Sequence, residues 1–579
     1  MNGGEIIARV LVKEGVKFIF TLSGGHIAPI FVEAKRAGLR VVDVRHEVNA
    51  VFAADAVARL SGIPGVATVT AGPGLTNTIT AVKNAQLAQS PVIVLGGATA
   101  TLLKGRGALQ DIDQMALMQP HVKWAVAIKR LKDFAPVLQQ AFTVCREGVP
   151  GPVFIECPVD LLYDEKIVRE WYLQGNQKPA RNLQERLQRW YISRHLNKIF
   201  SDQDNIRIED RRADYQIPTF AASQINTATQ YLLRSKKPVF IIGSQAVAEP
   251  EQTGRIVAAL EQIGAPIYLS GMARGLFGKD HRLQMRHKRR EALRDADLVL
   301  LAGVPCDFRL DYGRHIRSSS ICVSINRSKR DLYLNKKPQL AVQADAGNFI
   351  IELGNTLAGQ TTPDYSQWIE ALTARDRERE QEIDRQATQE LAGINPLKLF
   401  RELNAILSDN SVLVADGGDF VATASYTLHP RQQLCWLDPG AFGTLGVGGG
   451  FALGAKLVRP EAEVWIIWGD GSSAYSLAEF DTFVRHQIPI IGLIGNDACW
   501  SQIARDQIEI LKDDVASVLA HCDYHNVVKG FGADGTRIER IEELVPTIAQ
   551  ARAAIRQGRP YLINAIIGRS EFRKGSLSM

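Results

Sequence analysis

Two polar residues near the C-terminal end of the chain each follow a run of apolar residues. Asp470 comes just after the apolar run 464–468. Asn496 comes just after a second run, 490–494, and the residues between the runs, 477–487, have the pattern of a helix. A strand, a helix and a second strand are therefore predicted, and parallel α/β sheets bind ligands at the carboxyl ends of their strands. A carboxylate and an amide oxygen there suit a hard divalent cation that also holds a diphosphate.

Small residues around Asp470 favour the same interpretation. Gly469 and Gly471 flank it, and Ser472 follows. Glycine lets a backbone approach a phosphate group, and Ser472 is expected to open a helix whose N-terminus favours anions. The alternative is a glycine-rich turn between a strand and a helix that binds no ligand.

A third polar residue, Glu47, has a comparable setting near the N-terminus. It follows the predicted strand 41–44 and precedes an alanine-rich helical pattern over residues 51–62. Glu47 is therefore expected at the carboxyl end of a strand, where a helix begins. The alternative is a glutamate that only stabilises the positive end of the helix.

Short apolar runs alternate with helical patterns in three parts of the chain, about 1–165, 220–355 and 393–570. This alternation predicts parallel sheets with helices on both faces. We expect an α/β protein with three doubly wound parallel-sheet domains. Its clearest strands are residues 16–20, 41–44, 66–70, 91–95, 152–156, 237–242, 298–303, 320–325, 464–468 and 490–494, together with a run that begins at 412.

The two connecting segments have different compositions. Residues 166–216 are polar and basic, and 365–392 are charged with a helical pattern. We expect the first connector to contain a helix that packs on its own domain. A helix that lies on an anionic membrane surface or docks a partner is the alternative. The apolar stripe of this helix consists of Leu183, Leu187, Trp190, Leu196 and Ile199.

Bulk composition is that of an ordinary globular protein. The 579 residues are 46% hydrophobic and 22% charged, and a net charge of +6 spread over 63.8 kDa does not indicate nucleic-acid binding. The seven cysteines are widely spaced and form no CxxC pair, so we expect reduced thiols and a cytoplasmic protein. The sequence predicts neither a transmembrane segment nor a signal peptide.

Three motifs together resemble the acetohydroxyacid synthase-like superfamily of thiamine diphosphate (ThDP) enzymes. They are Arg-His-Glu at 45–47, Ala-Gly-Pro-Gly-Leu-Thr-Asn at 71–77, and Gly-Asp-Gly at 469–471 with Asn496. The resemblance covers nearly the whole chain except residues 170–220. It implies a ThDP pyrimidine-binding domain (1–168), a basic linker with an amphipathic helix (169–219), a central nucleotide- or CoA-binding-like domain (220–360), a helical connector (361–392), a ThDP diphosphate-binding domain (393–568) and a C-terminal tail (569–579).

The resemblance also implies roles for individual residues. Glu47 would be the catalytic carboxyl group that hydrogen-bonds the aminopyrimidine ring of ThDP, and two chains would pair so that it meets the diphosphate domain of the other chain. Gln110 matches an active-site glutamine; a solvated loop amide is the alternative. The expected ligands of Mg²⁺ are Asp470, Asn496 and the backbone carbonyl of Ala498. The expected contacts of ThDP are Glu47, Asn77, Gly418, Asp419, Phe420, Leu445, Gly471 and Ser472, with Leu445 as the apolar wedge under the bent cofactor or else an ordinary core residue.

Departures from the acetolactate synthase pattern indicate which branch the chain resembles. Residues 20–26 read Phe-Thr-Leu-Ser-Gly-Gly-His in place of Phe-Gly-x-Pro-Gly, and no Trp-Gln pair occupies its usual place after Asn496. Residues 21–26, 306–310 and 571–576 look like the 2-hydroxyacyl-CoA lyase group, which is labelled acetolactate synthase-like. Residues 270–275 resemble an element of the acyl-CoA enzymes of the superfamily. The substrate contacts so implied are Trp500, Arg274 and Arg573.

The expected reaction is reversible cleavage of a 2-hydroxyacyl-CoA to formyl-CoA and an aldehyde or ketone, with ThDP and Mg²⁺. The alternatives are acetolactate synthesis, other 2-ketoacid decarboxylation or carboligation, and a non-catalytic homologue that only binds cofactor. Arg274 would meet a phosphate of ADP or CoA in the central domain, or lie on the surface; the domain could equally keep FAD or nothing. The basic tail would close over the site, or be disordered. The resemblance further implies a homodimer or homotetramer with active sites between chains.

Overall fold

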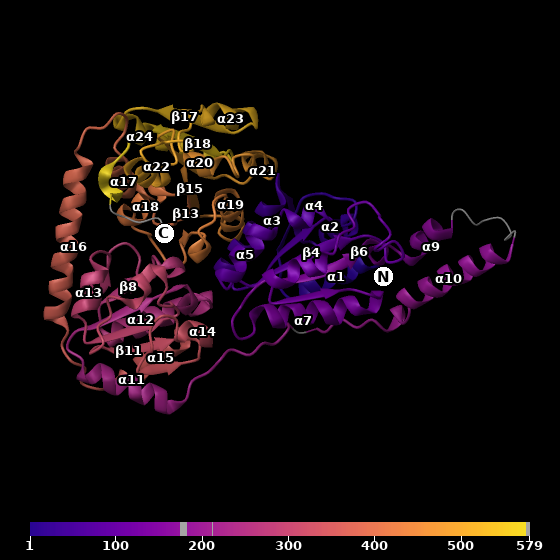
Figure 1. Cartoon of the computed structure of the whole chain (residues 1–579), viewed down its shortest axis with the longest axis horizontal. Coiled ribbons are helices and arrows are strands. Elements are labelled where there is room, and N and C mark those ends of the chain that lie inside the picture. Colours follow the sequence, from indigo (N-terminus) through magenta and orange to yellow (C-terminus); the bar gives the residue numbers. More distant parts are fainter. Residues whose placement is uncertain (174–181, 211, 575–579) are drawn as a thin grey trace. The chain divides into compact units, whose positions relative to one another are not determined.

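The computed structural model describes residues 1–173, 182–210 and 212–574 (Figure 1). The chain forms two compact units, which are described separately. Unit 1 comprises residues 1–58 and 63–216, and unit 2 comprises residues 59–62 and 217–579. The predicted fold class is confirmed, because the two units together contain three six-stranded parallel sheets.

Unit 1 contains one sheet with the strand order β2-β1-β3-β4-β6-β5. The five predicted strands are present; the sequence did not indicate β5, a short edge strand whose four residues are only half-buried. A core of apolar side chains from the sheet, α1 and α7 supports the strands. The strands are β1 (Phe18–Thr21), β2 (Arg40–Asp43), β3 (Gly65–Val69), β4 (Val92–Ala98), β5 (Trp124–Ala127) and β6 (Val153–Pro158), and the main helices are α1 (Gly3–Lys13), α2 (Ala28–Arg36), α3 (Glu47–Ser61), α5 (Ile79–Leu87) and α7 (Phe134–Arg146).

The helix predicted in the basic connector is α10 (Leu183–Ile199), which follows α9 (Glu165–Leu173). Leu196 and Ile199 are buried in the core of unit 1. The other three residues of the predicted stripe are not buried, since Leu183 is 72% exposed and Leu187 and Trp190 are each 58% exposed. The helix therefore packs on its own unit through its C-terminal half only.

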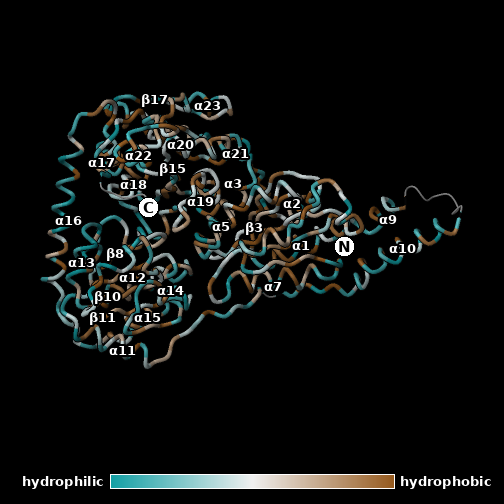
Figure 2. The backbone as a smooth tube through the Cα atoms, viewed as in Figure 1, coloured by the Kyte–Doolittle hydropathy of each residue, from teal (hydrophilic) through white to brown (hydrophobic). Residues whose placement is uncertain are grey.

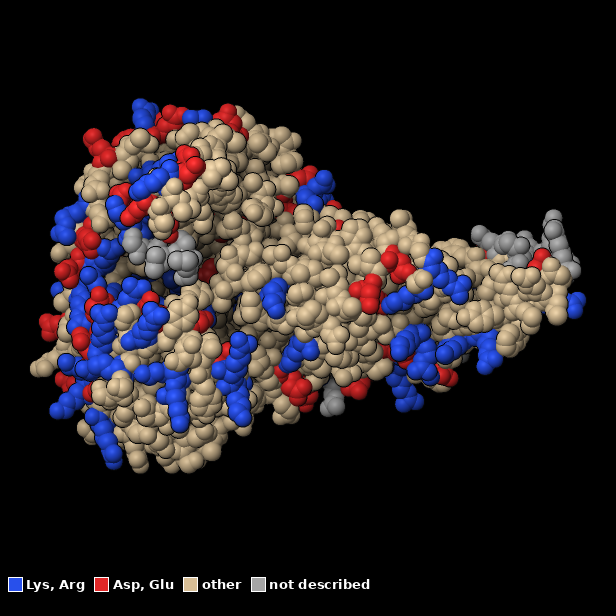
Figure 3. All heavy atoms as spheres, viewed as in Figure 1, with Lys and Arg blue, Asp and Glu red and all other residues tan. Residues whose placement is uncertain are grey.

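The first sheet of unit 2 is central in the sequence and has the order β12-β11-β10-β7-β8-β9. The predicted runs at 237–242, 298–303 and 320–325 form its β7, β10 and β11. Lys and Arg side chains gather over α13 on the face drawn in Figure 3. The elements are α11 (Ala222–Arg234), β7 (Pro238–Ile242), α12 (Thr253–Ile263), β8 (Ile267–Leu269), β9 (Gln284–Met285), α13 (Arg289–Asp295), β10 (Leu298–Ala302), β11 (Ile321–Ile325), α14 (Lys329–Leu332), β12 (Leu340–Val342) and α15 (Ala346–Leu357).

The second sheet of unit 2 has the order β14-β13-β15-β16-β18-β17. The helix predicted over 477–487 is α21, which is shorter at both ends because residues 477, 478, 486 and 487 form turns. The elements are α17 (Pro396–Ile406), β13 (Ser411–Asp416), α18 (Asp419–Thr427), β14 (Trp436–Leu437), α19 (Val447–Val458), β15 (Glu463–Gly469), α20 (Asp470–Ser473), α21 (Glu479–Arg485), β16 (Ile491–Asn496), α22 (Ser501–Leu511), α23 (Tyr524–Gly530), β17 (Asp534–Ile538), α24 (Leu544–Arg556) and β18 (Tyr561–Ile566).

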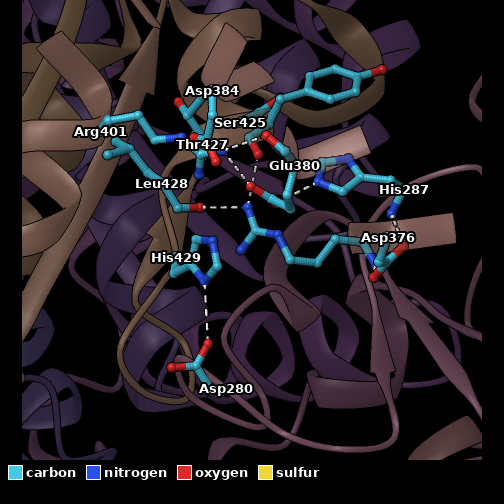
Figure 4. A network of polar contacts seen from close by, with 12 residues as sticks. Asp280, His287, Asp376, Glu380, Asp384, Arg401, Ser425, Thr427, Leu428 and His429 are labelled. Atoms are coloured by element: carbon cyan, nitrogen blue, oxygen red, sulfur yellow. Dashed lines mark hydrogen bonds and ion pairs between the residues drawn. The ribbon is translucent and has the colours of Figure 1, made fainter. Parts of the chain in front are cut away.

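The predicted second connector is α16 (Ser366–Ala387), a largely hydrophilic helix in Figure 2. Its Glu380 accepts a hydrogen bond from His287 Nε2 at 2.6 Å and pairs with Arg401 at 2.6 Å, as Figure 4 shows. Glu380 thus links the central part of unit 2 to its C-terminal part. Burial alone would raise the pKa of Glu380, but its bonds with His287 and Arg401 lower that pKa to about 2.

Two further expectations concern the chain as a whole. All seven cysteines are free, and only Cys522 is exposed. Within the described residues, no helix combines the length and hydropathy that crossing a bilayer would require. The domain boundaries proposed above stay predictions.

Candidate active site

The C-terminal sheet reverses its strand order between β13 and β15, which is where open parallel sheets bind ligands. Asp416 ends β13, and Asp470 follows β15. The two strands pair in register, with Asp416 opposite Trp468. Because the loops after the two strands emerge side by side, a Cβ atom on Gly417 would lie 2.9 Å from the backbone nitrogen of Gly469.

Asp470 is 2% exposed and lies at this point of strand reversal. Its Oδ1 accepts the N–H of Gly471 at 2.8 Å, and its Oδ2 accepts the N–H of Cys499 at 3.3 Å. Burial, followed by the nearby charge of Asp497, raises the pKa of Asp470 to about 7. A buried carboxyl group with a second carboxyl group beside it favours a cation.

The last residue of β16, Asn496, and the loop that follows it bring the other two predicted metal ligands to this end of the sheet. The amide nitrogen of Asn496 donates to the carbonyl of Cys522 at 3.2 Å and to Asn564 Oδ1 at 3.1 Å. Asn496 Oδ1 therefore faces the other way, 3.2 Å from His521 Nδ1. The carbonyl of Ala498 accepts the N–H of Leu519 at 2.8 Å and keeps a second lone pair. A cation would replace the His521 contact and use that lone pair.

Gly471 and Ser472 differ in what they offer a ligand. A Cβ atom on Gly471 would lie 2.5 Å from the ring of Trp500, so this ring covers the bare backbone of the loop. The hydroxyl of Ser472 donates to the carbonyls of Asp416 and Gly469 at 2.7 and 3.0 Å. Ser472 lies within α20 and does not open that helix, whose first residue is Asp470.

Asp419 and Phe420 stand in the first turn of α18. The carboxylate of Asp419 forms a two-pronged pair with Arg505, at 2.9 and 3.0 Å. The ring of Phe420 packs on Phe400 with centroids 4.5 Å apart. Since both side chains are engaged with the protein, these residues can meet an anion only through their backbone N–H groups at the helix N-terminus.

Asp416 is a site residue that the sequence did not single out. Its side chain is completely buried and accepts N–H groups from Gly446 at 3.0 Å, Gly448 at 2.8 Å and Trp468 Nε1 at 3.0 Å. Burial raises the pKa of Asp416 to about 6. Through these bonds Asp416 fixes the loop that carries Leu445. The sequence pattern that could have indicated Asp416 is a carboxylate at the end of an apolar run, followed by two glycines.

A cavity of about 510 Å³ unites most of these residues. The described beginning of the tail reaches it through residues 569–571 and 574, while 575–579 lie outside the described residues. The predicted site residues that line it are Gly418, Asp419, Phe420, Leu445, Asp470, Gly471, Ser472 and Trp500. Asn496 and Ala498 are the sequence neighbours of three lining residues, Gly495, Asp497 and Cys499.

The remaining predicted cofactor contacts lie in unit 1. Glu47 is the first residue of α3 and is 7% exposed. Its Oε2 accepts a hydrogen bond from Asn77 Nδ2 at 3.0 Å. Gln110 has a left-handed backbone, with φ of 64°, and a Cβ atom on Gly72 would lie 2.8 Å from its carbonyl oxygen. The glycine-rich loop at 72–74 therefore lies against both Glu47 and Gln110.

Arg274 and Arg573, the predicted substrate contacts, both lie against α18 in unit 2. Arg274 donates to the carbonyl of Ser425 at 3.0 Å and stacks on Trp436 at 5.2 Å. Arg573 stacks on Tyr426 at 5.1 Å. Burial lowers the pKa of Arg274, though an arginine stays charged. These contacts place both guanidinium groups near one helix.

Three family models match this chain. They are the N-terminal TPP binding domain (residues 1–117), the central domain (225–353) and the C-terminal TPP binding domain (416–565) of thiamine pyrophosphate enzymes. The chain belongs to the thiamine pyrophosphate enzyme family. Thiamine pyrophosphate is ThDP, so the predicted superfamily and its cofactor-binding domains are confirmed.

Full-length relatives carry two kinds of name. The chain is 48% identical to 2-hydroxyacyl-CoA lyase 2 from Danio rerio, across all of this chain and 93% of that protein. It is also 48% identical to 2-hydroxyacyl-CoA lyase 2 from Homo sapiens, across all of this chain and 92% of that protein. A probable acetolactate synthase from Mycobacterium bovis is 31% identical, across 98% of this chain and 96% of that protein.

The residues at the cavity fit the diphosphate end of ThDP with a divalent cation. The N-terminus of α18 and a cavity of about 510 Å³ lined by Gly418, Gly471 and Ser472 suit a diphosphate. A carboxylate, an amide oxygen and a backbone carbonyl are the oxygen ligands that Mg²⁺ prefers. Burial and the nearby charge of Asp497 raise the pKa of Asp470, so a cation would be attracted to this pair of carboxyl groups.

Proposed function

We propose that this protein is a ThDP- and Mg²⁺-dependent lyase that cleaves a 2-hydroxyacyl-CoA to formyl-CoA and an aldehyde or ketone. The observation that carries the proposal is the 48% identity over the whole chain to proteins named 2-hydroxyacyl-CoA lyase 2, against 31% to those named acetolactate synthase. The comparison spans the whole chain, so it includes the proposed catalytic and substrate-binding residues of every domain.

Each half of the site has a defined task in this proposal. Asp470, Asn496 and the carbonyl of Ala498 hold Mg²⁺, and the backbone of Gly418, Asp419, Phe420 and Gly471 meets the diphosphate. When bound, ThDP supplies a nucleophilic carbon and an electron sink for the pair of electrons released by the broken C–C bond. Glu47 holds a proton at the pyrimidine ring nitrogen, and Asn77 orients the carboxyl group of Glu47. Leu445 is the apolar wedge against the bent cofactor.

Substrate binding uses Trp500, which lines the cavity, and two arginines that lie against α18 outside that lining. Trp500 covers Gly471 and forms one wall for the acyl group. Arg274 and Arg573 supply positive charge for the CoA phosphates, and ADP or CoA occupies the central domain. The tail from residue 569 excludes water from the site. Two or four copies of the chain assemble so that Glu47 of one copy lies at the diphosphate-binding domain of another.

A second candidate is carboligation of 2-ketoacids, including acetolactate synthesis. The 31% identity to a probable acetolactate synthase over 98% of the chain favours it. Both reactions would use the same metal-binding and diphosphate-binding residues. They differ in the carbonyl compounds that serve as donor and acceptor.

Product analysis tests the two candidates directly. Purified protein with ThDP and Mg²⁺ is incubated with a 2-hydroxyacyl-CoA in one reaction and with pyruvate in another, each beside the variant Glu47→Gln. Formyl-CoA and an aldehyde from the first reaction, lost in the variant, support the lyase. Acetolactate from pyruvate with an inert thioester rejects the lyase and supports the second candidate.

A further inference from the structure

Unit 2 contains a second cavity, of about 660 Å³, and all of its lining residues belong to that unit. Three segments form most of its walls: one side of α12, the loop between β8 and β9, and the loop 431–434 before β14. Arg459, the residue after α19, also lines it. Its volume falls within the range of roughly 300–1,000 Å³ that is usual for small-molecule sites. We call this cavity the α12 groove.

The walls of the α12 groove are tied to one another. The hydroxyl group of Thr253 donates to Gln433 Oε1 at 2.6 Å, which joins α12 to the loop 431–434. Nδ1 of His429 lies 3.7 Å from Asp280 Oδ1, which brings the loop after β8 to the segment after α18 (Figure 4). Leu434 has a left-handed backbone, with φ of 53°, and such strain in a non-glycine residue persists only where its surroundings impose it. The groove is therefore preformed.

Two arginines give the α12 groove positive charge. Nη2 of Arg459 donates to the carbonyl of Gln433 at 3.1 Å. Arg431 donates to the carbonyls of Asn404 and His429. Among the described residues, neither guanidinium group forms an ion pair with a carboxylate. Burial lowers the pKa of both groups, but arginines stay charged and have five N–H donors each, so both can bind an anion.

The rest of the lining indicates what the anion carries. Most of the lining surface is polar, with carboxylates from Glu251 and Glu261 on the α12 side and an amide from Gln432 opposite. Carboxylates and amides bind hydroxyl groups. Phe277 stacks on His281 with ring centroids 4.4 Å apart and adds one apolar face. A long acyl chain would need a mostly apolar pocket, so an anion with several hydroxyl groups fits this lining better.

We propose that the α12 groove binds a small phosphate ester with several hydroxyl groups, the class to which sugar phosphates belong. Arg431 and Arg459 meet the phosphate group, since guanidinium groups form strong charge-assisted hydrogen bonds with phosphate oxygens. The side chains of Glu251, Glu261 and Gln432 meet the hydroxyl groups. This site goes beyond the proposed function and holds for either of the two candidate reactions.

The helix α19 separates this site from the cavity at Asp470. Leu445, just before the helix, lines that cavity, and Arg459, just after it, lines the α12 groove. The helix has 12 residues, and a rise of 1.5 Å per residue puts about 18 Å between its ends. The described lining residues of the two cavities do not overlap. Binding in the groove can therefore be measured while the first cavity is filled.

Isothermal titration calorimetry of the full chain, saturated with ThDP and Mg²⁺, tests the proposal. The probes are glucose 6-phosphate and ribose 5-phosphate, with inorganic phosphate, glucose and ADP for comparison. Arg431→Gln and Arg459→Gln each remove one charge, while Val257→Trp fills the groove and keeps both arginines. Arg255→Gln is the matched control, because Arg255 is an exposed arginine of the same helix and does not line the groove.

We expect a sugar phosphate to bind at one site per chain, at least about tenfold more tightly than inorganic phosphate, glucose or ADP. Each of the three groove variants should weaken this binding at least about tenfold, and the control should match the wild type. Four results would overturn the proposal. They are no binding of either sugar phosphate, equal or tighter binding of inorganic phosphate or ADP, unchanged affinity in both arginine variants, and unchanged affinity in Val257→Trp.

Discussion

Replacing Glu380 with glutamine should lower the free energy of unfolding of unit 2 by about 3 kcal/mol at pH 7. In the folded protein Glu380 receives a hydrogen bond from His287 and an ion pair from Arg401, each at 2.6 Å. Its side chain is 26% exposed, and that of His287 is 2% exposed. The substitution keeps the shape of the side chain and removes its charge, which leaves Arg401 with Asp384 as its remaining carboxylate partner, at 2.9 Å.

The magnitude follows from the pKa of Glu380. Folding lowers this pKa from 4.5 to about 2. At about 1.4 kcal/mol per pH unit, the difference corresponds to roughly 3 kcal/mol of stabilisation of the folded state. A lowered carboxyl pKa stabilises the folded protein above the unfolded value of 4.5, and this stabilisation is lost as the pH falls from 4.5 toward 2.

Urea unfolding followed by tryptophan fluorescence and far-ultraviolet circular dichroism measures this effect. Agreement between the two probes is needed, because a chain of two units need not unfold in one step. The difference between wild type and Glu380→Gln should be constant between pH 6 and 8 and shrink below about pH 4.5. Glu382→Gln is the matched control in the same helix, since Glu382 forms its ion pair with Arg379 and is 38% exposed.

The control should change the free energy of unfolding by no more than about 0.5 kcal/mol, as exposed pairs do. The reasoning would be refuted if Glu380→Gln unfolded like the control at pH 7. It would also be refuted if the difference between wild type and variant persisted unchanged at pH 3. The first result would mean that burial of Glu380 costs as much as its two partners return. The second would mean that the stabilisation does not depend on the ionised carboxyl group.

Three further perturbations address the candidate site. Gly471→Ala should weaken ThDP binding at least about tenfold, because the new methyl group would lie 2.5 Å from the Trp500 ring. Gly254→Ala is the control, because no atom lies within 4 Å of its added group. Equal ThDP affinity of the two variants in fluorescence titrations would contradict the prediction. Asp416→Ala leaves three N–H groups without their acceptor and should lower the free energy of unfolding by about 3 kcal/mol or more. Proteolysis near Leu445 should become faster. An unchanged cleavage pattern would show that Asp416 does not fix this loop. Deleting residues 569–579 should sharply reduce turnover because it removes the segment that lines the cavity and its buried anchor Phe572; unchanged rates would exclude the tail from the mechanism.

Local sequence patterns were sufficient to predict the sheets and the positions where their central strands end. The buried strands β7, β10, β15 and β16 all contain continuous apolar runs. The positions of Glu47 after β2 and Asp470 after β15 follow from the order of polar and apolar residues alone. Short edge strands such as β14, with two residues, carry too few side chains for a period to be recognised.

Tertiary structure decided which side chains meet. Asp419 pairs with Arg505, 86 residues away, and Arg274 reaches Ser425, 151 residues away. His26 meets Thr70 only because β1 and β3 are neighbours in the sheet. Strand and helix patterns depend on residues two to four positions apart, so one sequence can report them. Contacts across the ends of a parallel sheet depend on strand order and loop paths, and the packing of the whole unit determines both.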